Sequence, residues 1–237
     1  MKNKQLTQIG TLNSLMMGDY DAVITVKELL DKGDIGIGTY EGLDGEAIFL
    51  DGVAYNSRAD GTTSIMNPTD KVPFGTVAKF DESVKENQIS FNDIDELKLE
   101  LEKQLPSKNF FYMIKIEGSF NVRIRSCYKQ EKPYEPLYKV AKDQREYDFN
   151  EDGYVIGVYC PNYVQGMNLP GWHIHFLSKD YKHGGHILKL KSNNASYKIN
   201  ELDSWNVILP HTNGFENWDL TQDLKEKTKE VEGSSKK

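Results

Sequence analysis

Four of the chain's five histidines lie in one short stretch, GWHIHFLSKDYKHGGHILKL, which runs from Gly171 to Leu190. His173 and His175 are two residues apart, and residues at this spacing point to the same face of a β-strand. The tryptophan, isoleucine and phenylalanine that alternate with them point to the opposite face. The pattern therefore predicts a strand with two imidazoles on one face and large apolar side chains on the other.

A second alternating run begins at His186, directly after Gly184-Gly185, where we expect a tight turn. A hairpin of this kind brings the ring of His186 beside those of His173 and His175. His183 is the rival for the third position, but it lies on the approach to the turn, whereas His186 opens the return strand.

Three neutral imidazoles on adjacent strands form a rigid site for Zn²⁺, Fe²⁺ or Mn²⁺, with open positions for water or substrate. The competing interpretation is that these are ordinary hydrogen-bonded core or surface histidines. The candidates nearby for a fourth protein ligand are few, namely Asp180 and His183. This favours an open site over a closed structural one.

Charge and cysteine content exclude several classes of protein. The chain has 237 residues with 29 Lys and Arg against 36 Asp and Glu, a net charge of −7, which argues against a nucleic-acid partner. No apolar run reaches membrane-spanning length, and the N-terminus lacks the apolar segment of a signal peptide. Cys127 and Cys160 are most simply free thiols in a reducing cytosol. We therefore expect a cytoplasmic protein without a membrane partner, and the sequence allows a homodimer.

Turn dipeptides divide the first part of the chain. Asp44-Gly45, Asp51-Gly52 and Asp60-Gly61 flank two strand-like runs, residues 46–50 and 53–58. Alternating apolar residues between such turns predict an antiparallel meander.

The rest of the chain contains one clear helix signal and several strand signals. Residues 94–105 keep apolar side chains at helical spacing, with Asn92 or Asp93 as the N-cap. Strands are expected over residues 109–117 and, after a turn at Gly118, over 119–127, and then over 153–159, 195–199 and 204–209. Residues 220–231 are expected to form a polar C-terminal helix or tail.

These elements indicate an α+β fold with mostly antiparallel sheet and peripheral helices. We expect two sub-domains. Residues 1–148 would form an α+β meander domain, and residues 149–237 would form a β-sheet or barrel that carries the metal site.

Several motifs, in order and with family-like separations, resemble those of the α-acetolactate decarboxylase family along nearly the whole chain. The matching segments are 33–39 (GDIGIGT), 42–46 (GLDGE), 105–109 (LPSKN), 130–134 (QEKPY), 170–176 (PGWHIHF) and 184–186 (GGH). The resemblance implies conversion of α-acetolactate into acetoin and CO2, usually with one zinc ion on three histidines. The matching positions are His173, His175 and His186, in agreement with the hairpin argument.

The resemblance also implies two glutamates and an arginine at the metal. The glutamate of the GLDGE segment is Glu46, and the arginine before QEKPY is Arg125. A glutamate near the C-terminus reaches back to the site, and its best match is Glu232, with Glu230 as the rival. The threonine before GLDGE is Thr39, which is expected to line the pocket.

Without the resemblance, these residues have ordinary interpretations. Arg125 alternates with apolar residues on a strand and reads as a surface arginine. Arg123, two residues before it on the same face, is a further candidate for the site, although its spacing to Gln130 disfavours it. Glu46 reads as a solvated residue after a turn, and Glu232 as part of a charged tail.

The implied chemistry is a decarboxylation in which the metal stabilises an enediolate, which is then protonated. Arg125 would orient the small-molecule substrate, and Glu46 or Glu232 would relay the proton. Two alternatives stay open from the residues alone. One is a cupin-like three-histidine oxygenase or isomerase, and the other is a small-ligand binding protein with a structural metal.

Overall fold

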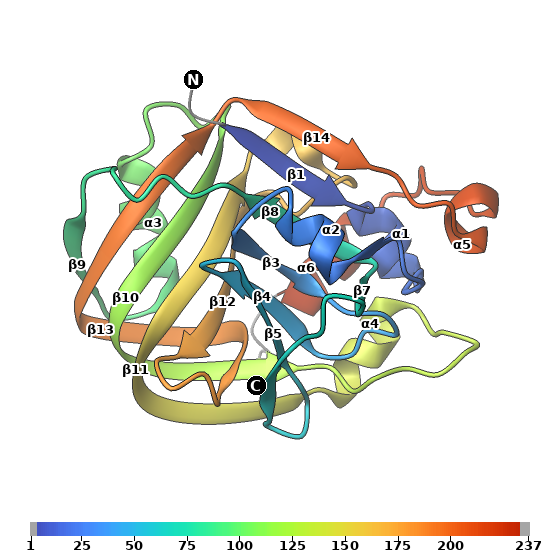
Figure 1. Ribbon diagram of the computed structural model, residues 1–237, viewed down its shortest axis with the longest axis horizontal. Helices are drawn as coiled ribbons and strands as arrows, with labels where there is room; N and C mark the ends of the chain where they lie inside the picture. Colours follow the sequence, from blue (N-terminus) through green and yellow to red (C-terminus); the bar gives the residue numbers. More distant parts are fainter. Residues whose placement is uncertain (1–3, 233–237) are drawn as a thin grey trace.

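The computed structural model describes residues 4–232, which form two large sheets and a two-stranded one, with helices at the periphery (Figure 1). The first sheet has seven strands, and all of its neighbouring pairs are antiparallel except the parallel pair β1–β14. In sheet order the strands are β14 (Ser204–Ile208), β1 (Gln5–Ile9), β8 (Phe74–Ala78), β3 (Ile35–Thr39), β4 (Glu46–Leu50), β5 (Val53–Ser57) and β6 (Thr63–Ile65). The predicted α+β class and the meander of β4 and β5 are confirmed.

The second sheet is closed on itself. Its strands are β10 (Phe111–Ser126), β11 (Arg145–Cys160), β12 (Gly171–Ser178), β13 (Gly184–Leu202) and β9 (Asn87–Phe91). Because β10 pairs with both β11 and β13, the four strands β10, β11, β12 and β13 form a closed circuit of hydrogen-bonded neighbours. The histidine-bearing strand is thus held between two long strands in a small barrel.

Alternation along these strands separates two cores. Val155, Ile174 and Phe176 belong to the apolar cluster that also contains the buried face of α3 (Ile94–Lys103). Ile156 and Val158 point the other way, into the cluster shared with the seven-stranded sheet. The side of β12 opposite Ile174 and Phe176 therefore faces the first sheet, and this is the side that carries the histidines.

The remaining elements are short. The other helices are α1 (Leu12–Met17), α2 (Val26–Leu30), α4 (Leu137–Val140), α5 (Asn213–Asn217) and α6 (Lys225–Glu232), with 3-10 turns at Ala141–Asp143 and Asn162–Val164 and a small ladder of β2 (Ile24–Thr25) with β7 (Lys71–Val72). Thr25 and Glu28 form a reciprocal capping box on α2. Asp93, and not Asn92, caps α3 through its side chain.

Three predictions about glycines and strand ends were wrong. Gly118 does not turn the chain but lies inside β10, opposite Gly153 and Ala195. Gly184 and Gly185 are the first residues of β13, and the turn consists of the residues before them. Residues 195–199 are part of β13 rather than a separate strand. At Gly118 a Cβ would lie 2.7 Å from the Asn194 carbonyl oxygen, so this glycine allows close packing of strands and not a reversal.

The boundary expected near residue 149 falls inside β11, and β10 pairs with β11 on both sides of it. The division into two sub-domains at that residue stays a prediction. Cys127 and Cys160 are free and buried. Among residues 4–232, no helix has the length and apolar character that crossing a bilayer would require.

Candidate metal centre

β12 supplies two of the three predicted imidazoles. His173 and His175 lie on its inward side, opposite Val158 and Ile156 of β11. The ring of His175 is almost fully buried, with 1% of its surface exposed, and its Nδ1–H donates to the Ala47 carbonyl oxygen of β4 at 3.0 Å. Because this bond uses the Nδ1 proton, the lone pair of His175 Nε2 points toward the other rings.

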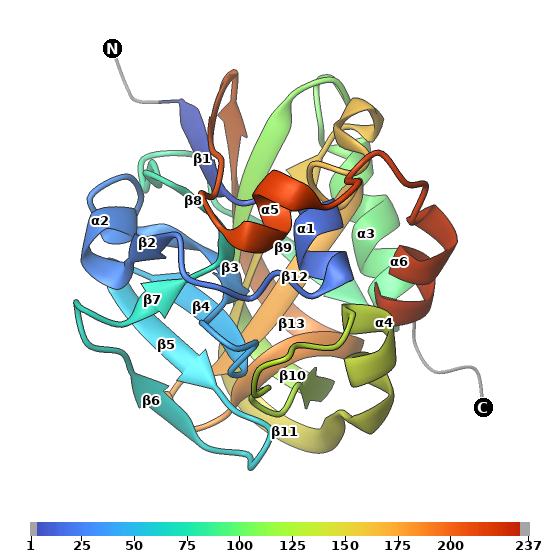
Figure 2. The ribbon, with the colours of Figure 1, turned by 90° about the vertical axis from the view of Figure 1, so that its right-hand side faces the viewer.

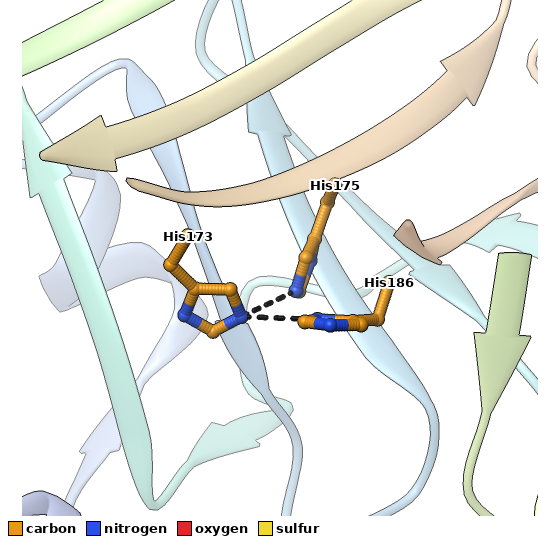
Figure 3. Close-up of side chains that lie close together, drawn as sticks. All are labelled: His173, His175 and His186. Carbon is orange, nitrogen blue, oxygen red and sulfur yellow. Dashed lines mark hydrogen bonds between the residues drawn. The ribbon is translucent and has the colours of Figure 1, made fainter. Parts of the chain in front are cut away.

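β13 brings in the third ring, because His186 pairs directly with His175 across the two strands. The nitrogen atom Nε2 of His173 lies 3.2 Å from His175 Nε2 and 3.2 Å from His186 Nδ1 (Figure 3). The rival, His183, lies elsewhere: its Nδ1 is 3.0 Å from Glu151, and its ring stacks on Phe149. The preference for His186 over His183 as the third member of the group agrees with this geometry.

The group has the chemistry of a metal site. One nitrogen from each ring lies within 4.8 Å of the others. Two nitrogens of a tetrahedral zinc site are about 3.3 Å apart, given Zn–N bonds of about 2.0 Å, so the 3.2 Å separations fit a shared cation. Burial lowers the pKa of His173 and of His175 to about 3, and that of His186 well below its usual value. The rings are therefore neutral at physiological pH, as metal ligands must be.

Two carboxylates lie beside the three rings. Glu46, at the start of β4, places Oε2 3.5 Å from His175 Nε2. Glu232, the last residue of α6, places Oε2 3.4 Å from His186 Nε2 and 3.9 Å from His173 Nε2. Burial raises the pKa of Glu46 to about 8, and Arg125 opposes this shift. Burial also raises the pKa of Glu232, again opposed first by Arg125.

Arg125 is 7% exposed and lies directly opposite His186 in the β10–β13 ladder. None of residues 4–232 makes an ion pair or hydrogen bond with its guanidinium, which lines a cavity together with Glu46 and Glu232. Arg123 points elsewhere and pairs with Asp148 at 2.7 Å. Arg123, the further candidate that the spacing to Gln130 disfavoured, does not line the cavity, whereas Arg125 is buried and lines it.

Thr39 lies opposite Glu46 in the β3–β4 ladder and lines the same cavity. Its hydroxyl donates to the Gly45 carbonyl oxygen at 2.8 Å, which fixes the turn that leads into Glu46. The structure therefore brings together all seven residues that the sequence singled out. Glu230, the rival of Glu232, is exposed on the surface of α6.

Sequence reasoning missed the apolar part of the cavity wall. α1, α4 and α6 contribute to it, and the residues are Leu12, Leu15, Leu43, Phe74, Cys127, Leu137 and Val231. All seven are buried in one cluster. Nothing local marks these residues, because short helices from distant parts of the chain bring them together.

Comparison with known proteins gives a consistent result. The family model for alpha-acetolactate decarboxylase matches residues 6–222. The chain is 38% identical to the alpha-acetolactate decarboxylase of Brevibacillus brevis, over 92% of this chain and 77% of that protein. It is 36% identical to the corresponding protein of Methanosarcina mazei, over 96% of this chain and 80% of that one.

Solved structures agree. The crystal structure of alpha-acetolactate decarboxylase from Bacillus subtilis strain 168 superposes with a TM-score of 0.93 at 34% identity, covering 97% of this chain and all of that one (100%). A Staphylococcus aureus protein described as similar to alpha-acetolactate decarboxylase superposes with a TM-score of 0.88 at 30% identity, covering 96% of this chain and 98% of that one. The chain belongs to the α-acetolactate decarboxylase family.

Proposed function

We propose that this protein decarboxylates α-acetolactate to acetoin and CO2, with a divalent cation, zinc in the first place, on His173, His175 and His186. The observation that carries the proposal is the convergence of three neutral imidazoles beside a cavity that two of them, His173 and His186, line together with two carboxylates and a guanidinium. Family membership favours this lyase over the oxygenase and the binding protein that the residues alone allowed.

A cation held by the three imidazoles would act as a Lewis acid toward the ketone and hydroxyl oxygens of the substrate, where negative charge develops as the C–C bond breaks. Arg125 is suited to bind and orient the substrate's oxygens. Its buried guanidinium faces the cavity without an ion pair to any of residues 4–232, so its donors are available to a ligand.

After CO2 leaves, the carbon that carried it must receive a proton. Glu46 lies beside His175, and Glu232 lies beside His173 and His186. Burial favours the protonated form of each glutamate. A carboxylic acid with a pKa near the working pH is an effective proton donor. We assign the proton relay to these two glutamates.

The apolar residues that line the cavity have a role of their own in binding the substrate. Leu43, Phe74 and Leu137 are each almost fully buried and line the cavity. We propose that this wall holds the two methyl groups of α-acetolactate and limits the access of water, which strengthens the electrostatic interactions in the site.

The direct test is to incubate the purified protein with α-acetolactate and to measure acetoin and bound metal. The His175→Ala variant should lose the metal and acetoin formation together, because the other two rings cannot hold a cation tightly. The matched control is His183→Ala, which removes a histidine of the same hairpin outside the group and should leave both unchanged. Normal acetoin formation by the His175→Ala variant would refute the assignment.

A further inference from the structure

Glu232 also borders a second cavity, on the side of α3. His173, His186 and Glu232 line both this cavity and the one described above, so they form a wall between the two. Arg125 lines only the first cavity, and Lys98 of α3 lines only the second. The carboxylate of Glu232 therefore lies in a wall with one cation on each side.

Lys98 has no close carboxylate partner among the residues that the structure describes. The side chain is half-buried, and no carboxylate of residues 4–232 lies within 4.0 Å of its ammonium group. Burial lowers the pKa of Lys98, and Glu232 opposes this more strongly than Asp95 and Glu102, which lie on the same helix as the lysine. The main carboxylate that opposes this shift thus belongs to another helix, whereas Arg125 and His175 act on the pKa of Glu232 more strongly than Lys98 does.

Glu232 needs such a cation because its position is electrostatically unfavourable. It ends α6, where the negative end of the helix dipole opposes a carboxylate. It also shares the buried site with Glu46, and the two carboxyl groups disfavour each other's charged form.

α6 buries few of its side chains. Thr228 and Val231 are the buried residues of this eight-residue helix. Figure 2 shows α6 beside α4, and these two helices are in contact. Lys98 of α3 and Glu232 at the end of α6 line the same cavity, so a charge on α3 can act on the end of α6.

We propose that Lys98 is a positioning residue that holds the carboxylate of Glu232 against His173 and His186 from the side opposite Arg125. The consequence for turnover rests on the proposed function, because it requires Glu232 to relay a proton. The claim that Lys98 holds the end of α6 in place does not depend on the proposed function.

Hydrogen exchange of the α6 amides, in metal-free and in zinc-loaded protein, tests whether Lys98 holds α6 in place. Lys98→Met keeps much of the side-chain volume and removes the charge, and we expect exchange in α6 about fivefold faster, with exchange in β12 unchanged. Lys98→Arg should restore the wild-type rate. Lys103→Met, on an exposed lysine of the same helix that pairs with Glu100, is the matched control and should behave as wild type.

A double variant separates charge from packing. If Lys98 acts through Glu232, Lys98→Met should add little to the exchange rate of a Glu232→Gln protein. The proposal is overturned if Lys98→Met does not differ from Lys103→Met, or if its effect persists in full beside Glu232→Gln.

Turnover provides a separate reading. With α-acetolactate we expect Lys98→Met to lower kcat with little change in KM, and Lys98→Arg to recover most of it. Suppose that Lys98→Met speeds exchange in α6 but the wild-type protein forms no acetoin. That result would support the role of Lys98 in holding α6 and refute the proposed function, so the two failures can be told apart.

Discussion

At the scale of single residues, burial determines the chemistry of this site. Glu46 follows an Asp-Gly turn, a position that is normally solvated, yet it packs 3.5 Å from His175. The same burial lowers the pKa of the histidines and raises that of Glu46 to about 8. Removal from water therefore keeps the rings ready to bind a cation and keeps a proton on the carboxyl group.

Replacement of Glu46 by glutamine tests its role in proton relay. General acid catalysis contributes about 10²- to 10⁴-fold, so we expect kcat to fall by at least about 10²-fold while bound zinc stays constant. Only the protonated acid can donate, so wild-type turnover should fall as the pH rises past the pKa of Glu46. A bound cation lowers that pKa from the value of about 8 for the metal-free site. This alkaline limb should be absent in the variant, whose amide does not titrate.

The matched control is Glu117→Gln, which alters an exposed glutamate paired with Lys179. It should keep the wild-type rate and pH profile. A Glu46→Gln enzyme within twofold of wild type would remove Glu46 from the mechanism.

At the scale of elements, α6 brings its last residue, Glu232, into the site. Its buried side presents Val231 to the apolar cluster and Glu232 to the imidazoles, while Glu230 faces solvent. The sequence left Glu230 and Glu232 as rivals because the tail has too little pattern to fix a register. The helix resolves this geometrically, since residues two apart on a helix point to different sides.

Exchange of each of these glutamates for glutamine tests the register. Glu232→Gln should lower kcat by at least about 10-fold, because the amide cannot relay a proton. Glu230→Gln changes an exposed residue and should stay within about twofold of wild type. Acetoin formation under saturating substrate measures both, and equal effects of the two substitutions would contradict the assignment.

Strand β10 illustrates where local sequence signals fail. Gly118 was read as a turn because glycine usually marks one, but β10 continues through it between β11 and β13. The reason is tertiary: a side chain there would collide with Asn194 and Ala195 of β13.

A substitution at Gly118 measures this close packing. Gly118→Val should lower the free energy of unfolding by at least about 2 kcal/mol, because overpacking forces the strands apart. Glu117→Val at the exposed neighbouring position should cost less than about 1 kcal/mol, since it breaks only a surface ion pair. Denaturant unfolding gives both values, and equal losses would show that the close approach at Gly118 carries no stability.

At the scale of the whole molecule, two kinds of information located the site. The strand period of two and the hairpin placed His173, His175 and His186 together without any reference to a family, because these contacts lie between neighbouring strands. Glu46, Arg125 and Glu232 approach from β4, β10 and α6, elements far apart in the sequence. No local pattern encodes that approach, so their residue types alone suggested surface positions, and only the resemblance to a family pointed to them.

The closed barrel and the seven-stranded sheet each supply part of the centre. The barrel holds the three rings, and the sheet contributes Glu46 and the carbonyl oxygen of Ala47 that orients His175. The site therefore exists only when the two sheets pack together. Binding of a cation to this folded state should stabilise the whole chain.

The most direct measurement is the recovery of acetoin formation as zinc is titrated into metal-depleted protein. We predict no turnover without metal, a linear rise that ends at one zinc per chain, and neither binding nor recovery in His186→Ala, while His183→Ala follows the wild type. Full turnover in metal-free protein, or recovery by zinc in His186→Ala equal to that of the wild type, would contradict a catalytic cation on the three imidazoles.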